Sequence, residues 1–141
     1  MKKLSLFSLV SFALLALTPA ALAQDYPDGY PPDLFRNVLL QDMPGWYARE
    51  CPFDPSENAT GMACAVLPRS PESARLWLDR EILGYSDLVM VTPWSGGDSS
   101  WTRSIYAEAV NQIIIIGITG INGGYDTLVA FVFYPPGYLL D

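Results

Sequence analysis

The chain has 141 residues with 15 acidic side chains, 8 Lys and Arg, no histidine and a formal net charge of −7 at pH 7. The absence of histidine excludes Ser-His-Asp and Cys-His catalysis, since both need an imidazole base. So few cations also exclude the basic patch that binding to nucleic acid by counterion release requires.

Residues 1–23 have the pattern of a secretory signal peptide. A basic start, Met1-Lys2-Lys3, precedes the uncharged run Leu4 to Leu17, and Ala21-Leu22-Ala23 matches a small-x-small cleavage site. The run is shorter than the ~20 residues that a membrane-spanning helix needs. We therefore expect cleavage after Ala23 and an exported protein, periplasmic or extracellular, with no membrane span.

Cleavage would leave one domain of ordinary size with an unusual set of charges. Both lysines, Lys2 and Lys3, leave with the signal, so the formal charge falls from −7 to −9. Without lysine there is no Schiff base and no Ser-Lys pair, and a zinc site would have to combine two cysteines with carboxylates. We expect no metal and no cofactor.

Residues 24–45 are interpreted as an extended, mobile N-terminal arm, and residues 46–141 as a single domain. Gln24 to Asp33 is rich in proline, glycine and acids, a composition that cannot bury enough apolar surface to fold alone. Leu34 to Leu40 fits a short helix or a strand, and Asp42-Met43-Pro44-Gly45 is a turn signal.

The two cysteines, Cys51 and Cys64, are predicted to form one structural disulfide, as a pair in an exported chain most simply does. A redox pair is the alternative, but the spacing is not Cys-x-x-Cys. The strand that begins at Trp46 is expected to lead into Cys51.

A strand over Met62 to Leu67 and the clearest helix in the chain come next. Ser70 is a good N-cap, Pro71 fits the first turn, and Gly84 is a plausible stop. One helical face carries the apolar side chains Ala74, Trp77, Leu78, Ile82 and Tyr85. Leu76 and Leu83 fall on the opposite side, where they would contact the N-terminal segment or form an exposed patch for a partner.

The rest of the chain is predicted to be β-structure. Asp87 to Pro93 is interpreted as a buried strand, and Trp101 to Val110 as a strand in preference to a helix. Four consecutive isoleucines indicate a strand buried on both faces over Ile113 to Thr119, and Asn122-Gly123-Gly124 is a hairpin signal before the strand Thr127 to Tyr134. The fold class is α+β, with one main helix packed on an antiparallel or mixed sheet of about four to five strands.

The candidate ligand-binding residues are Trp94, Asp98, Trp101 and Tyr106. Two tryptophans bracket a flexible Gly/Ser/Asp stretch, and flat aromatic rings can stack on sugars while Asp and Ser supply hydrogen bonds. The alternative is an ordinary hairpin loop whose tryptophans pack inward.

These features favour a small exported binding or accessory domain without catalytic residues, acting as a monomer or weak oligomer on an unidentified protein or glycan partner. One alternative is a carboxylate-dependent hydrolase, which needs a concave site holding two acids. The other is a secreted inhibitor or envelope stress protein.

Overall fold

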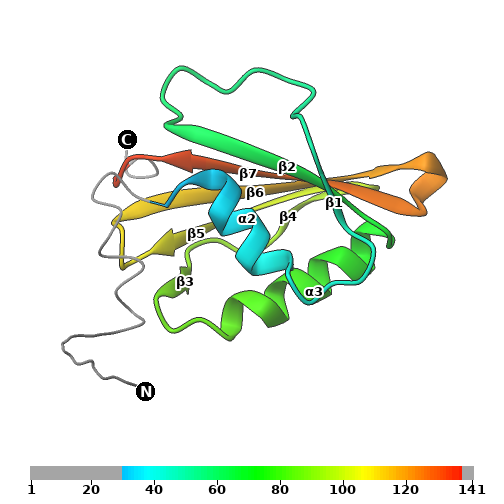
Figure 1. Ribbon diagram of the computed structural model, residues 1–141, viewed down its shortest axis with the longest axis horizontal. Helices are drawn as coiled ribbons and strands as arrows, with labels where there is room; N and C mark the ends of the chain where they lie inside the picture. Colours follow the sequence, from blue (N-terminus) through cyan, green and yellow to red (C-terminus); the bar gives the residue numbers. More distant parts are fainter. Residues whose placement is uncertain (1–29, 138–141) are drawn as a thin grey trace, which may run out of the picture. The chain divides into compact units, whose positions relative to one another are not determined.

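The computed structural model describes residues 30–137. The predicted signal peptide and residues 24–29 of the predicted arm lie outside this range. The elements, labelled in Figure 1, are α2 (Pro32–Leu40), β1 (Tyr47–Arg49), β2 (Gly61–Leu67), α3 (Pro71–Leu83), β3 (Leu88–Met90), β4 (Ser95–Gly97), β5 (Ser100–Ala107), β6 (Gln112–Ile121), the 3₁₀ turn η1 (Asn122–Gly124) and β7 (Asp126–Tyr134).

The strands form one antiparallel sheet in the order β1-β2-β7-β6-β5-β3, and β4 pairs with β5. This confirms the α+β class, the antiparallel sheet, the strand at Trp101 and the hairpin at Asn122. The predicted strand count was too low, because the sheet has seven strands. The sequence predicts strands at the positions of β1 and β3, which have only three residues each, whereas β4, also of three residues, lies in the stretch interpreted as flexible.

The prediction of one main helix was also incomplete, because α2 lies within the predicted arm. Phe35, Leu39 and Leu40 of α2 are buried, and the Phe35 ring packs edge-on against Phe131 and Phe133 with centroids 5.6 and 5.4 Å apart. Packing on the sheet therefore selects helix for a segment whose sequence fitted helix and strand equally.

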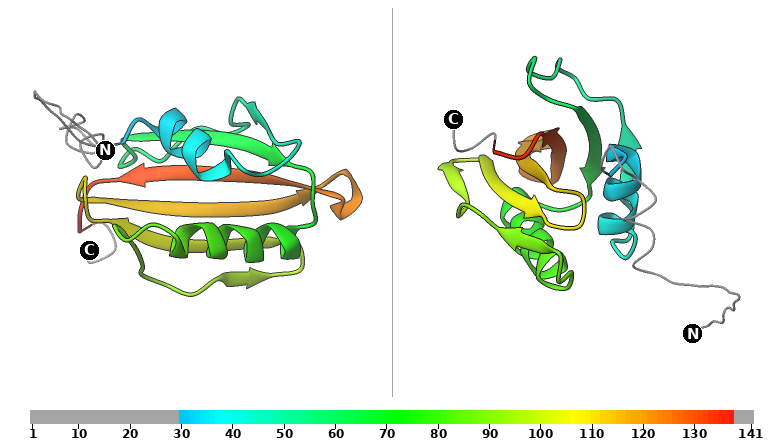
Figure 2. Two further views of the ribbon diagram at one scale, coloured as in Figure 1. Left: turned by 60° about the horizontal axis from the view of Figure 1, so that its bottom comes forward. Right: turned by 90° about the vertical axis from the view of Figure 1, so that its left-hand side faces the viewer.

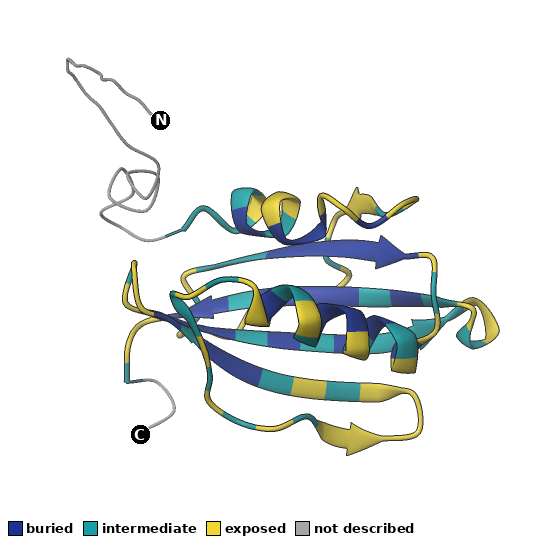
Figure 3. Cartoon of the chain, turned by 90° about the horizontal axis from the view of Figure 1, so that it is seen from below, coloured by how far each residue is buried: buried dark blue, intermediate teal, exposed yellow. Residues whose placement is uncertain are grey.

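Both helices cover the same face of the sheet (Figure 2). In the register, Phe131 and Phe133 lie opposite Ile116 and Ile114, and Ile114 lies opposite Ile105. All five side chains are fully buried. Figure 3 shows this buried layer behind the helices, with β4 exposed at the margin.

The predicted ends of α3 are confirmed. The Ser70 hydroxyl accepts a hydrogen bond from the Ser73 amide at 3.3 Å, Pro71 occupies the first turn, and Gly84 is the C-cap. Neither α2 nor α3, the α-helices within residues 30–137, has the length and apolar character of a bilayer-spanning segment.

We call the other side of the sheet the open face, because neither α2 nor α3, the α-helices of the described range, covers it. Met62, Ile115, Leu128 and Val132 point to this face and are half-buried. The expectation that the isoleucine strand is buried on both faces was therefore wrong at Ile115. The predicted strand at Asp87 is an edge strand in which Val89 is 41% exposed, because β5 is its neighbour on one side and no strand among residues 30–137 pairs with its other side.

Candidate functional site

Trp94 packs inward against α3. Its indole Nε1 donates a hydrogen bond to Asp79 Oδ1 at 2.8 Å, and the Arg103 guanidinium lies 5.7 Å from the ring centroid. Arg103 forms an ion pair with the same carboxylate at 2.7 Å and donates to the Thr92 carbonyl at 2.9 Å. These bonds hold the segment between β3 and β4 on the helix side of the sheet.

Trp101 also lies on the helix side. It pairs with Ile118 in the register, and the Arg75 guanidinium of α3 stands 4.3 Å from its ring centroid. Both tryptophan rings are thus engaged with arginines of the same domain.

Tyr106 and Asp98 lie elsewhere. Tyr106 points to the open face and donates a hydrogen bond to Asn111 Oδ1 at 2.6 Å, while Asp98 is exposed in the β4–β5 turn with φ of 57°. The structure therefore divides the four predicted site residues between the two faces of the sheet and an exposed turn. Their role in ligand binding stays a prediction.

A concave region of about 600 Å³, here called the sheet hollow, lies on the open face. Its hydroxyl groups come from Ser95, Ser100, Thr102 and Thr119, and its apolar side chains from Phe53, Leu128 and Ala130. Trp101 and Ile118 also border it, although their side chains point to the helix side. Gly96 and Gly117 complete it. The volume is in the range of about 300–1,000 Å³ typical of small-molecule sites.

Gly117 opens the floor of the sheet hollow. A Cβ added there would meet just one atom, the Thr102 methyl carbon, at 3.9 Å. Its register partner, Ala130, is small as well, so the adjacent central strands β6 and β7 both lack a large side chain at this position. A glycine inside an isoleucine-rich strand often marks a close approach to the backbone, and this signal could have located the hollow from the sequence.

The lining of the sheet hollow is uncharged. Of the described residues that line it, none is Asp, Glu, Lys or Arg. Within residues 30–137 there is also no group of three or more potential metal-ligating side chains. The lining therefore presents hydroxyl groups and apolar surface, which are better suited to binding a neutral molecule than to general acid–base catalysis.

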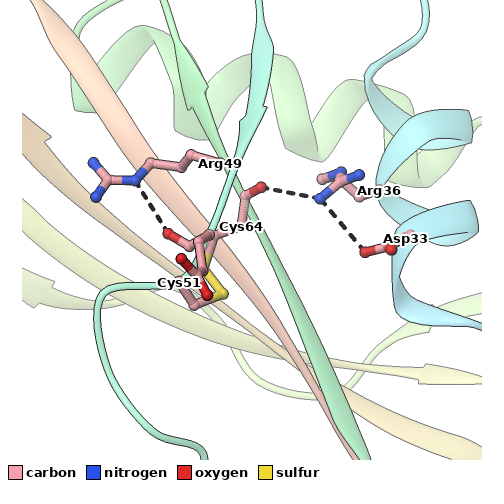
Figure 4. Close-up of a disulfide and its surroundings, with 6 residues drawn as sticks. Asp33, Arg36, Arg49, Cys51 and Cys64 are labelled. Atoms are coloured by element: carbon pink, nitrogen blue, oxygen red, sulfur yellow. Dashed lines mark hydrogen bonds and ion pairs between the residues drawn. A yellow bond between two sulfur atoms is a disulfide. The ribbon is translucent and has the colours of Figure 1, made fainter.

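The predicted disulfide is present and borders this region. Cys51 and Cys64 are joined (Figure 4), with Cα atoms 5.2 Å apart. Cys64 is fully buried and lies opposite Ala130 in the register. Arg36 of α2 donates to the Cys64 carbonyl at 3.2 Å and pairs with Asp33 at 3.5 Å. A disulfide is compatible with an exported protein.

Residues 50–60 form a long connection between β1 and β2 on the side of the sheet away from α3 (Figure 1). Phe53 of this segment lines the sheet hollow and is 44% exposed. The Ser56 hydroxyl donates to the Tyr134 hydroxyl at 3.1 Å, and the Thr60 amide donates to the Phe133 carbonyl at 2.7 Å. The hollow therefore has a sheet floor and an aromatic wall from an irregular segment.

A second, smaller hollow of about 370 Å³ lies at the start of α3. Arg69, Arg80 and Glu72 line it together with Leu76, which is 59% exposed. Leu83 is 74% exposed, so α2 and the other described residues bury neither leucine. Because this smaller hollow combines basic, acidic and apolar side chains, its lining does not indicate one class of ligand.

No protein-family model matches the chain, and comparisons with curated proteins and with solved structures give no match either.

Proposed function

We propose that the chain is a small exported binding domain, without catalytic residues, that holds a neutral and largely apolar small molecule in the sheet hollow. The observation that carries the proposal is the concave, uncharged region that the two helices leave uncovered. A sheet face of this kind would otherwise expose apolar surface to water, and concave apolar sites with a few polar groups are the usual form of small-molecule sites.

The lining specifies the chemistry of the ligand. A charged molecule would lose its hydration without gaining an ion pair, because the described lining residues carry no charge. The Ser100 and Thr119 hydroxyls are hydrogen-bonded to each other, which leaves one hydroxyl hydrogen of that pair and the Thr102 hydroxyl for a hydroxyl, ether or carbonyl of the ligand. Leu128 and Ala130 bury its apolar part.

Composition supports binding without catalysis. The chain contains no histidine, and its two lysines both belong to the predicted signal peptide. A hydrolase that relied on carboxylates would need two acids facing one cleft, and the described lining of the sheet hollow includes none.

The proposal is tested by titrating the mature protein with the neutral apolar dye N-phenyl-1-naphthylamine, whose fluorescence rises in apolar surroundings. Gly117→Leu should weaken binding by at least about tenfold, because the new side chain occupies the floor of the hollow. Ile115→Phe is the matched control, since it changes the same face of β6 outside the hollow and should bind as the wild type does.

Absence of dye binding by the wild type, or equal binding by Gly117→Leu, would contradict the proposal. A glycan array with wild type and Trp94→Ala examines the prediction from sequence. Glycan capture that depends on Trp94, without any dye binding, would replace the sheet hollow by the tryptophan segment as the binding site.

A further inference from the structure

We infer that Phe53 determines the affinity of the sheet hollow and that the Cys51–Cys64 disulfide positions it, so that ligand binding depends on the oxidised state of the cysteines. This inference rests on the proposed function, because it assigns roles within the same hollow.

Phe53 differs from the other described residues that line the hollow. Those residues belong to β5, β6 and β7 or to the short strand β4, whereas Phe53 comes from the irregular segment between β1 and β2. Among the described lining residues, Phe53 alone contributes an aromatic ring from outside the sheet, and 44% of its surface is exposed. An exposed ring beside an uncharged concavity has apolar area left to bury against a ligand.

The disulfide is the attachment nearest to Phe53. Cys51 lies two residues before it, and Cys64 lies opposite Ala130, which itself lines the hollow. The next attachment is the hydrogen bond from the Ser56 hydroxyl to Tyr134, three residues after Phe53 and near the sheet margin. The cross-link thus ties the segment to the sheet beside the hollow.

Reduction of the disulfide would remove that link and leave the sheet floor intact. The residues from Pro52 to Asn58 are exposed and contribute no core packing. A segment with few buried contacts samples many conformations once its anchor is lost, and each departure of Phe53 opens one wall of the hollow. The floor, formed by β6 and β7, keeps its ladder of backbone hydrogen bonds.

The experiment measures N-phenyl-1-naphthylamine binding by wild type, Phe53→Ala, Phe53→Tyr and the double variant Cys51→Ser/Cys64→Ser. We expect about tenfold weaker binding for Phe53→Ala and for the double variant, and wild-type affinity for Phe53→Tyr, which keeps the ring. Adding Phe53→Ala to the double cysteine variant should cause no further loss, because the ring is already displaced.

A variant with two glycines inserted after Cys51 covers the case in which the double cysteine variant does not fold. It keeps the disulfide but moves Phe53 off the hollow, so the same tenfold loss is expected. Wild-type affinity in Phe53→Ala, or in a folded variant without the disulfide, would overturn the inference. If Gly117→Leu still abolishes binding in that case, the proposed function stands; if Gly117→Leu binds normally, both fail.

Discussion

Gly61 and Gly117 lie in strands of the same sheet, yet the missing side chain serves a different purpose at each. At Gly61 an added Cβ would come within 2.7 Å of the Pro32 ring at the start of α2. At Gly117 it would enter open space on the opposite face, with its nearest contact at 3.9 Å. One glycine makes room for a helix and the other makes room on the surface.

These two glycines should therefore respond differently to the same substitution. Gly61→Ala should lower the free energy of unfolding by about 1–3 kcal/mol, because a proline ring yields little to an overpacked contact. Gly117→Ala should change it by less than about 1 kcal/mol, since the methyl group meets ordinary contact and alanine restricts the unfolded chain. Urea unfolding followed by circular dichroism measures both values, and equal losses would refute this account of the two positions.

At the scale of elements, both helices begin in the same way. Pro32 opens α2 above Gly61, and Pro71 opens α3 above Gly120, where an added Cβ would lie 3.0 Å from the proline ring. Proline suits the first helical turn because the amide it lacks would have no intrahelical partner there. Helix initiation and close packing on the sheet thus coincide at each helix.

The docking of α2 can be tested at Phe35. Its ring is 6% exposed and packs between α2 and two phenylalanines of β7, so Phe35→Ala should cost about 3–5 kcal/mol of unfolding free energy. Val38→Ala is the matched control on the same helix, where a side chain that is 36% exposed should cost less than about 1 kcal/mol. Denaturant unfolding gives both numbers; similar small effects would mean that α2 adds little to the folded domain.

Element length explains which parts of the fold could be predicted. α3, β6 and β7 span 9 to 13 residues and carry a cap, a β-branched run or an alternating pattern, so local sequence identifies them. The three-residue strands pair with longer neighbours that supply their hydrogen bonds. Local sequence predicts a strand at β1 and at β3 without giving its true length, and it does not predict β4. The candidate site shows the same limit, because the partners that turn Trp94 inward, Asp79 and Arg103, are distant in sequence.

For the molecule as a whole, the charge inventory fixes how stability responds to pH. The chain has no histidine, and both lysines lie in the predicted signal peptide. Apart from the terminal amine and the cysteines, the chain holds no group with an ordinary pKa between those of carboxylates, near 4, and tyrosine, near 10. The cysteines do not titrate, because they form the disulfide.

We therefore expect a free energy of unfolding that is nearly constant from about pH 6 to pH 9. Above about pH 10 it should fall, because burial, and then the charges of Glu81, Asp42 and Asp87, raise the pKa of Tyr85 in the folded state. The unfolded chain loses this proton first, so stability declines as pH rises from the ordinary tyrosine pKa through the raised one. Urea titrations across pH 5–11 check the profile, with Tyr85→Phe as the control that should soften the alkaline decline.

The amino-acid sequence by itself determined the α+β class, the boundaries of α3, the central hairpin and the cysteine pairing. The first three depend on neighbours along the chain, and the pairing follows because the chain has only two cysteines. Tertiary structure alone decided that residues 32–40 form a helix, that the tryptophans turn toward α3, and that Gly117, Ala130 and Phe53 meet at one hollow. Those outcomes depend on strand order and register, which bring together residues far apart in the chain and which no local pattern encodes.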